Sequence, residues 1–245
     1  MASEKVTVFE EGKVLLFDKP VYWTSFDLVN KVRIIIRSTF GIRKLKVGHA
    51  GTLDPLASGL MIICTGKATK KIDEFRDLDK EYVATFHLGE TTPSFDLETE
   101  TDKHFPTGHI TEEMVKAVLF GFLGEQKQLP PMYSAKLIEG KRAYEFARKG
   151  IDKKLEAVTV SFREIELLKF EIPEIKVRLV CSKGTYIRSF ARDFGQALKS
   201  GSYLSSLERT AIGPYHIKDA FNLEKFKEYI EQMSSTCCSE TDNIL

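Results

Sequence analysis

The sequence predicts a protein of mixed α and β structure. Short apolar or alternating runs, which are typical of strands, are interspersed with amphipathic stretches that have helical spacing. The 245 residues include 42% hydrophobic side chains, which is enough for a sizeable core in one large domain or two small ones. No internal repeat or low-complexity segment is evident.

The first part of the chain is predicted to contain two strands and a helix. Residues 13–17 (KVLLF) and 60–64 (LMIIC) are apolar runs that favour strands. Thr24 or Ser25 is a suitable N-cap for a helix over about residues 26–37.

The remaining elements follow from the same signals. The alternation in residues 80–89 favours a half-buried strand. Residues 1–10 are predicted to be an N-terminal extension and residues 234–245 a flexible tail. Further strands are expected over 158–170 and 175–181, and helical structure over 67–79, 112–122, 142–149, 188–198 and 221–233.

Composition excludes several classes of protein. The formal net charge is +1, so a nucleic-acid surface must be a local patch. Neither a signal peptide nor an apolar run near the roughly 20 residues of a membrane helix is present, which predicts a cytoplasmic protein. No zinc spacing, P-loop or dinucleotide fingerprint appears, so we expect no metal and no cofactor. Reduced thiols are expected at Cys64, Cys181, Cys237 and Cys238.

The stretch KVGHAGTLDPLASGLMIICTGK, residues 46–67, is the strongest candidate for a functional site. Pro55 biases Asp54 away from helical backbone, and the nearby glycines allow unusual turns. A fixed carboxylate on a Gly-rich loop, anchored by an apolar strand, suits an active site. An Asp-Pro pair is often only a turn, so the residue types alone leave both interpretations open.

The string GHAGTLDPLASGLMIICTGKATK resembles the active-site motif of the TruB family of bacterial tRNA pseudouridine synthases. This resemblance implies that Asp54 is the catalytic residue and that His49 fills the space left by an extruded nucleotide. The segment FDKPVYWTSFD resembles the first motif of the family, with Tyr22 in place of the usual glycine. Because tyrosine does not tolerate positive φ as glycine does, we expect this loop to take a different path. The resemblance makes Lys19 and Pro20 supports of the active-site loop.

The second long match to the family is CSKGTYIRSFARDFG. By resemblance, Arg188 pairs with Asp54, Tyr186 packs against the target base, and Leu207 lines the pocket. Such a charge-assisted bond would keep the carboxylate charged and aimed. Tyr82 fills the position of the tyrosine that stacks on the base, although its strand pattern is equally that of a core aromatic.

Basic residues suggest where RNA is held. The segment of about residues 126–152 corresponds to an RNA-gripping thumb, although residue types alone fit an ordinary surface hairpin equally well. Leu137 stands at the position of a usual lysine, and Glu208 at that of a frequent arginine. We expect ETTPSFDLETETD to be an exposed loop in which Asp96 matches a family aspartate. The residues expected to contact RNA are Lys19, Arg43, Lys46, Lys136, Lys141 and Arg142.

The resemblance also implies the architecture and the reaction. The fold would be α+β, with a mixed, mainly antiparallel sheet, flanking helices and a central RNA-binding cleft. One catalytic domain would cover residues 11–233, with no C-terminal RNA-binding domain of the PUA type. The expected activity is isomerisation of uridine 55 in the tRNA T-loop by a monomer without an obligatory protein partner. An RNA-guided enzyme, a non-catalytic RNA-folding factor and a glycoside hydrolase are the alternatives, the last normally needing two carboxylates.

Overall fold

The computed structural model of the protein describes residues 8–134, 136–138, 140–147, 149–151, 153 and 155–235. The chain divides into two compact units. Unit 1 consists of Met1–Leu78 and Glu208–Leu245, and unit 2 of Asp79–Leu207. Cys237 and Cys238 lie outside the described residues, whereas Cys64 and Cys181 are buried and form no disulfide.

The centre of unit 1 is β3 (Ser58–Thr65), which is buried almost throughout. It pairs antiparallel with β1 (Val14–Lys19) and with β2 (Val47–His49). Its first residues pair in parallel with the end of β12 (Ser202–Ile212), which then turns into β13 (Tyr215–His216). A strand with partners on both edges is shielded from water along its backbone, which suits its apolar sequence.

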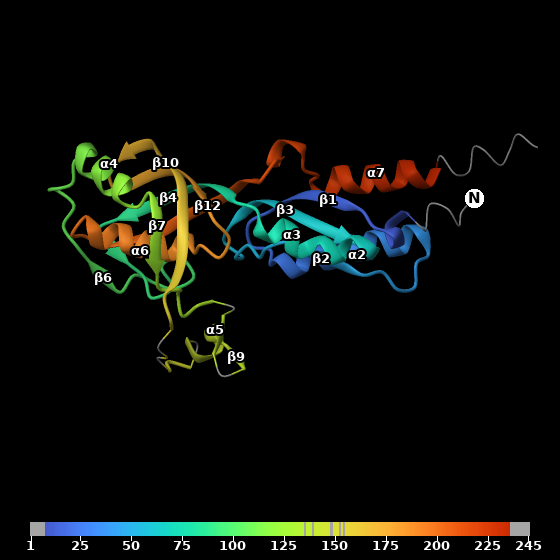
Figure 1. Ribbon diagram of the computed structural model, residues 1–245, viewed down its shortest axis with the longest axis horizontal. Helices are drawn as coiled ribbons and strands as arrows, with labels where there is room; N and C mark the ends of the chain where they lie inside the picture. Colours follow the sequence, from blue (N-terminus) through green and yellow to red (C-terminus); the bar gives the residue numbers. More distant parts are fainter. Residues whose placement is uncertain are drawn as a thin grey trace, which may run out of the picture. The chain divides into compact units, whose positions relative to one another are not determined.

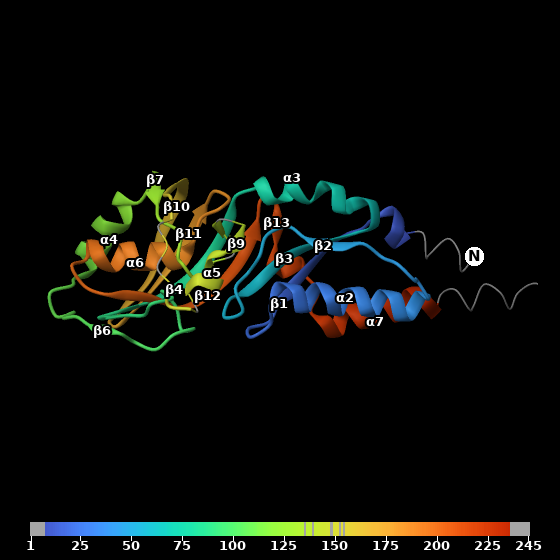
Figure 2. The same cartoon turned by 90° about the horizontal axis from the view of Figure 1, so that it is seen from below.

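Helices cover both faces of this sheet, as Figure 2 shows. On one face lie α2 (Ser25–Phe40) and α7 (Leu223–Ser235), and on the other lies α3 (Ile72–Asp77). Thr24 caps α2 with a reciprocal Thr24–Asp27 capping box, and Gly41 ends the helix in the left-handed conformation. The short 3₁₀ helices η1 and η2 span Gly66–Lys71 and Ile217–Asp219.

The sheet of unit 2 has the strand order β12-β4-β11-β10-β7. Its members β4, β11, β10 and β7 pair antiparallel, and β4, β7 and β10 are labelled in Figure 1. One face packs on α6 (Ile187–Ala197), whose Phe190 ring lies 5.4 Å from the ring of Phe86 in β4. The strands are β4 (Lys80–Leu88), β7 (Gly124–Gln128), β10 (Val158–Glu171) and β11 (Glu174–Cys181).

Short elements complete unit 2. Helix α4 (Glu112–Gly121) is capped by Thr111, whose side chain accepts from the Met114 N–H. Two small hairpins are β5–β6 (Glu90–Thr91 with Lys103–His104) and β8–β9 (Leu137–Ile138 with Lys141–Arg142), and the second leads into α5 (Ala143–Ala147).

The structure confirms the predicted mixed, mainly antiparallel sheet with flanking helices. The predicted strands and helices within the described residues are present, but several strands were not predicted, among them β2, β7 and β12. In β12, Ser, Thr, Glu and Arg interrupt the apolar pattern that would indicate a strand. Ala197, which helical spacing would place inward, is exposed because the buried stripe of α6 follows Phe190, Phe194 and Leu198.

Candidate active site

Asp54 lies in the turn between β2 and β3, and the backbone on both sides of it is hydrogen bonded to the start of α2 and to the loop before that helix. The Ser25 hydroxyl donates to the Leu53 carbonyl and accepts from the Leu53 N–H, each at 2.9 Å. The Tyr22 N–H donates to the Pro55 carbonyl at 2.7 Å. Asp54 itself is partly exposed.

Tyr22 departs from the expected backbone. It has a φ of +69°, the left-handed conformation that glycine adopts freely. The expectation that tyrosine forces this loop onto a different path therefore fails at this residue. The bond from its N–H to Pro55 helps to hold the conformation.

Lys19 lies beneath this loop and is fully buried. Its ammonium donates to the carbonyls of Pro20 at 2.9 Å and Trp23 at 2.7 Å. Burial lowers the pKa of Lys19 to about 8, while the nearby Asp54 carboxylate partly opposes that shift. These contacts suit a support of the loop and lend nothing to the prediction that Lys19 contacts RNA.

His49 ends β2 and pairs with Ile63 of β3. Burial is the main cause that lowers the pKa of His49, and the Arg209 guanidinium adds to this effect. The lowered pKa favours the neutral imidazole at neutral pH, and a neutral flat ring is suited to fill the space of a base.

Arg209 is a residue that sequence reasoning missed. It is 1% exposed, and its Nε donates to the Leu60 carbonyl at 2.7 Å. A second guanidinium nitrogen donates to the Gly51 carbonyl at 3.2 Å, which ties β12 to the loop that carries Asp54. Arginines are mostly exposed, so nothing in the sequence signalled this burial.

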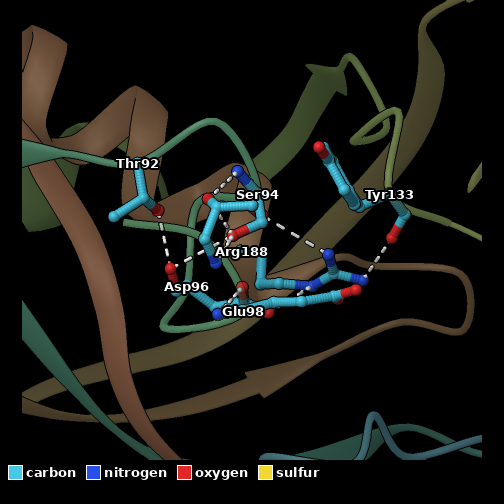
Figure 3. A network of polar contacts seen from close by, with 7 residues as sticks. Thr92, Ser94, Asp96, Glu98, Tyr133 and Arg188 are labelled. Carbon is cyan, nitrogen blue, oxygen red and sulfur yellow. Dashed lines mark hydrogen bonds and ion pairs between the residues drawn. The ribbon is translucent and has the colours of Figure 1, made fainter. Parts of the chain in front are cut away.

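In unit 2, Arg188 is held by a network that Figure 3 shows. It lies in the first turn of α6 and is 4% exposed. Its guanidinium donates to the Tyr133 carbonyl at 2.8 Å and to the Ser94 carbonyl at 3.4 Å. Its Nε lies 3.5 Å from a carboxylate oxygen of Asp96. The acid and the carbonyls fix the orientation of the guanidinium plane.

The loop that carries Asp96 is itself ordered by hydrogen bonds. The Thr92 hydroxyl donates to the Asp96 carbonyl at 2.6 Å, and the Glu98 N–H donates to the Asp96 carboxylate at 2.9 Å. Thr92, Ser94 and Asp96 are buried, so the prediction of an exposed loop is wrong for these residues. The hydroxyls of Thr92 and Ser94 both donate to the Asp96 carbonyl, and these bonds hold the loop turned inward.

The tyrosines predicted to meet the base both lie in unit 2. The Tyr186 backbone is clamped by Gln128, which accepts from its N–H at 2.8 Å and donates to its carbonyl at 3.0 Å. Tyr82 lies on β4 and is 8% exposed, on the same buried face as Phe86. Leu207 lies on β12 and is half-buried.

The predicted RNA-binding residues lie on both units. Arg43 and Lys46 of unit 1 are exposed between α2 and β2. Lys141 and Arg142 are exposed on β9 in unit 2. The Lys136 ammonium donates to the Glu156 carbonyl at 3.1 Å, so part of its bonding capacity is used within the chain.

Each unit thus brings together part of the predicted site. Unit 1 gathers Lys19, His49 and Asp54, and unit 2 carries Tyr82, Tyr186, Arg188 and Leu207. The pairing of Arg188 with Asp54 joins residues of different units and stays a prediction. Within the described residues there is no group of three or more metal-ligating side chains, and no helix there is long and apolar enough to cross a membrane.

Solved structures with a similar fold indicate the class of protein. A chain in the structure of a Cbf5-Nop10-Gar1 complex is 29% identical, with a TM-score of 0.70, over 91% of this chain and 56% of that chain. A chain of an H/ACA RNP bound to a substrate RNA containing 2'-deoxyuridine is 27% identical, with a TM-score of 0.66, over 93% of this chain and 55% of that chain. The present chain spans about half the length of each. These likenesses confirm the predicted pseudouridine synthase fold.

The sequence comparisons are more specific. Residues 37–187 match the model of the family described as TruB family pseudouridylate synthase (N terminal domain). The tRNA pseudouridine synthase B of Phocaeicola vulgatus is 57% identical over 91% of this chain and 95% of that protein. The protein of the same name from Chloroherpeton thalassium is 42% identical over 97% of each. The chain belongs to the TruB family of pseudouridylate synthases.

Proposed function

We propose that this protein converts uridine 55 in the T-loop of tRNA to pseudouridine, with Asp54 as the catalytic carboxylate. The observation that carries the proposal is the turn at Asp54, which is bonded to Tyr22 and Ser25 and lies close to the buried Lys19 ammonium. Relatives named tRNA pseudouridine synthase B, one of them 57% identical, support tRNA as the substrate.

The reaction breaks the bond between uracil N1 and C1′ of the ribose, turns the base, and joins C5 to C1′. The proton on C5 is released and N1 gains one, so the reaction is an isomerisation that needs no redox partner. Asp54 would act at the sugar–base junction by addition to C1′, by addition to C6, or by favouring removal of the C2′ proton. In the last route Tyr82 is the candidate base.

The uridine must leave the RNA stack first, which costs a few kcal/mol. His49, in its neutral form, would occupy the vacated space, and stacking on Tyr82 and Tyr186 would offset the cost. Arg188, held by Asp96 and the Tyr133 carbonyl, would pair with Asp54 and keep the carboxylate aimed.

The exposed basic residues Arg43, Lys46, Lys141 and Arg142 would contact the phosphates of the T-arm. The enzyme would act as a monomer, without a guide RNA or protein partner. Because its substrate is tRNA, its place of action would be the cytoplasm. Residues 11–233 would form the catalytic domain, with residues 126–152 as its RNA-gripping segment.

The test is tritium release from a tRNA transcript labelled at uracil C5. The wild type should release tritium, and Asp54→Asn should lose at least about a hundredfold in rate because the amide carries no charge. Glu74→Gln, a matched exposed carboxylate on α3 of the same unit, should keep the wild-type rate.

The alternatives predict other results. A transcript with cytidine at position 55 should release nothing, and release from it would overturn the choice of site. Free uracil among the products would indicate a hydrolase. Tight binding of tRNA without release by the wild type would favour an RNA-folding factor, and release only after addition of a guide RNA with protein partners would favour the RNA-guided class.

A further inference from the structure

Tyr22 combines strong exposure with an unfavourable backbone. Its side chain is 81% exposed, more than any other large apolar side chain among the described residues. No described residue bonds to its hydroxyl. The ring therefore contributes little to the core or to the polar contacts of the fold.

The backbone conformation makes this exposure significant. A φ of +69° is unfavourable for a bulky residue because its Cβ crowds the neighbouring carbonyl, whereas glycine adopts it freely. Strained residues of this kind cluster where binding or catalysis requires them. A tyrosine that is strained and also unpacked suggests a role toward a ligand.

The position of Tyr22 indicates which ligand. Its N–H donates to the Pro55 carbonyl at 2.7 Å, so its backbone touches the residue next to Asp54. Lys19 fixes the loop on both sides of it through the carbonyls of Pro20 and Trp23. Tyr22 thus lies on a preorganised loop whose backbone contacts the turn that carries the proposed catalytic carboxylate.

We propose that Tyr22 stacks on an unpaired base of the RNA substrate adjacent to the uridine at Asp54. This inference rests on the proposed function. The bases of an RNA loop are unpaired, so base faces remain open outside the gap that His49 would fill, and proteins stack exposed aromatic rings on such faces. Tyr22 is then a substrate-positioning residue, and its hydroxyl is dispensable.

The experiment compares RNA binding in an Asp54→Asn background, where the proposed function makes turnover at least about a hundredfold slower. Tyr22→Gly should weaken binding of a T-arm stem-loop by roughly tenfold, the expected order for one lost stack. Tyr22→Phe should bind within twofold of its parent. Phe120→Ala, which removes an exposed aromatic from α4 of unit 2, is the matched control and should bind unchanged.

A second readout identifies the base. The fluorescent base 2-aminopurine is placed in turn at each loop position that flanks the target. At one of these positions, the parent and Tyr22→Phe should quench its fluorescence, and Tyr22→Gly should not. The melting temperature of Tyr22→Gly should not fall, because glycine relieves the left-handed strain. A folded variant with weakened binding therefore reports on the ring.

The outcomes separate the two proposals. A wild type that converts and binds tRNA, together with a Tyr22→Gly variant of equal affinity and equal quenching, would overturn stacking alone. If Tyr22→Phe lost as much affinity for the RNA as Tyr22→Gly, the result would overturn stacking in favour of a contact made by the hydroxyl. A wild type that neither converts nor binds tRNA would overturn the proposed function and stacking together.

Discussion

Lys19 places a buried ammonium close to the Asp54 carboxylate. Burial of a charge is unfavourable unless the charge is compensated. Here the compensation comes from the carbonyls of Pro20 and Trp23 and from the charge of Asp54. It is incomplete, because burial still lowers the pKa of Lys19 to about 8.

This shift predicts a stability that depends on pH. The folded-state pKa of about 8 lies below the ordinary value of 10.5, so the folded protein binds fewer protons than the unfolded chain between these values. The contribution of Lys19 to the free energy of unfolding should therefore rise as the pH increases from about 8 to 10.5. Lys19→Met should lack this rise, as measured by urea unfolding at several pH values. If the free energy of unfolding depended on pH in the same way in both proteins, the lowered pKa of Lys19 would be contradicted.

At the scale of elements, the contact between β3 and β12 positions the candidate site. Gly59 of β3 pairs with Arg209 of β12, whose side chain bonds the Gly51 loop. A Cβ at Gly59 would lie 2.4 Å from the Arg209 carbonyl oxygen, and Gly59 has a φ of +107°. Only glycine permits the two backbones to approach this closely.

Gly59→Ala should therefore destabilise the protein by about 2–5 kcal/mol, since a clash with backbone cannot relax cheaply. Gly41→Ala is the matched control, because Gly41 also has a positive φ but nothing lies within 4 Å of an added Cβ. The free energy of unfolding of Gly41→Ala should fall by only about 1 kcal/mol. Chemical denaturation measures the free energy of unfolding of both variants. Equal losses would mean that the close approach of the β3 and β12 backbones at Gly59 is unimportant.

At the scale of the whole molecule, the residues proposed for the active site come from both units. Unit 1 carries Asp54 and His49, and unit 2 carries the network around Arg188. The chain passes between the units at Leu78–Asp79 and again within β12 at Leu207–Glu208. The proposed Arg188–Asp54 pair would therefore couple the two units.

A double-mutant cycle tests that coupling. If Arg188 pairs with Asp54, then Arg188→Lys and Asp54→Asn should be non-additive in the free energy of unfolding by about 1–3 kcal/mol. The pair Arg188→Lys and Glu74→Gln should be additive, because Glu74 is an exposed residue of α3. Additivity within about 0.5 kcal/mol in the first pair would overturn the predicted contact.

The sequence by itself determined the class of elements and the strongest candidate residue. Periodicity located strands such as β3 and helices such as α2, because these patterns depend on near neighbours along the chain. The long motif around Asp54 indicated the TruB family, which the comparisons confirm.

Tertiary structure decided what surrounds that residue. The burial of Lys19 and Arg209, the inward turn at Asp96 and the left-handed Tyr22 depend on contacts between distant parts of the chain. Tyr22 meets Pro55, and Arg209 meets Gly51. Local propensity favours exposure for the charged residues and ordinary backbone for the tyrosine, so only packing and hydrogen bonding across the fold could reverse each preference.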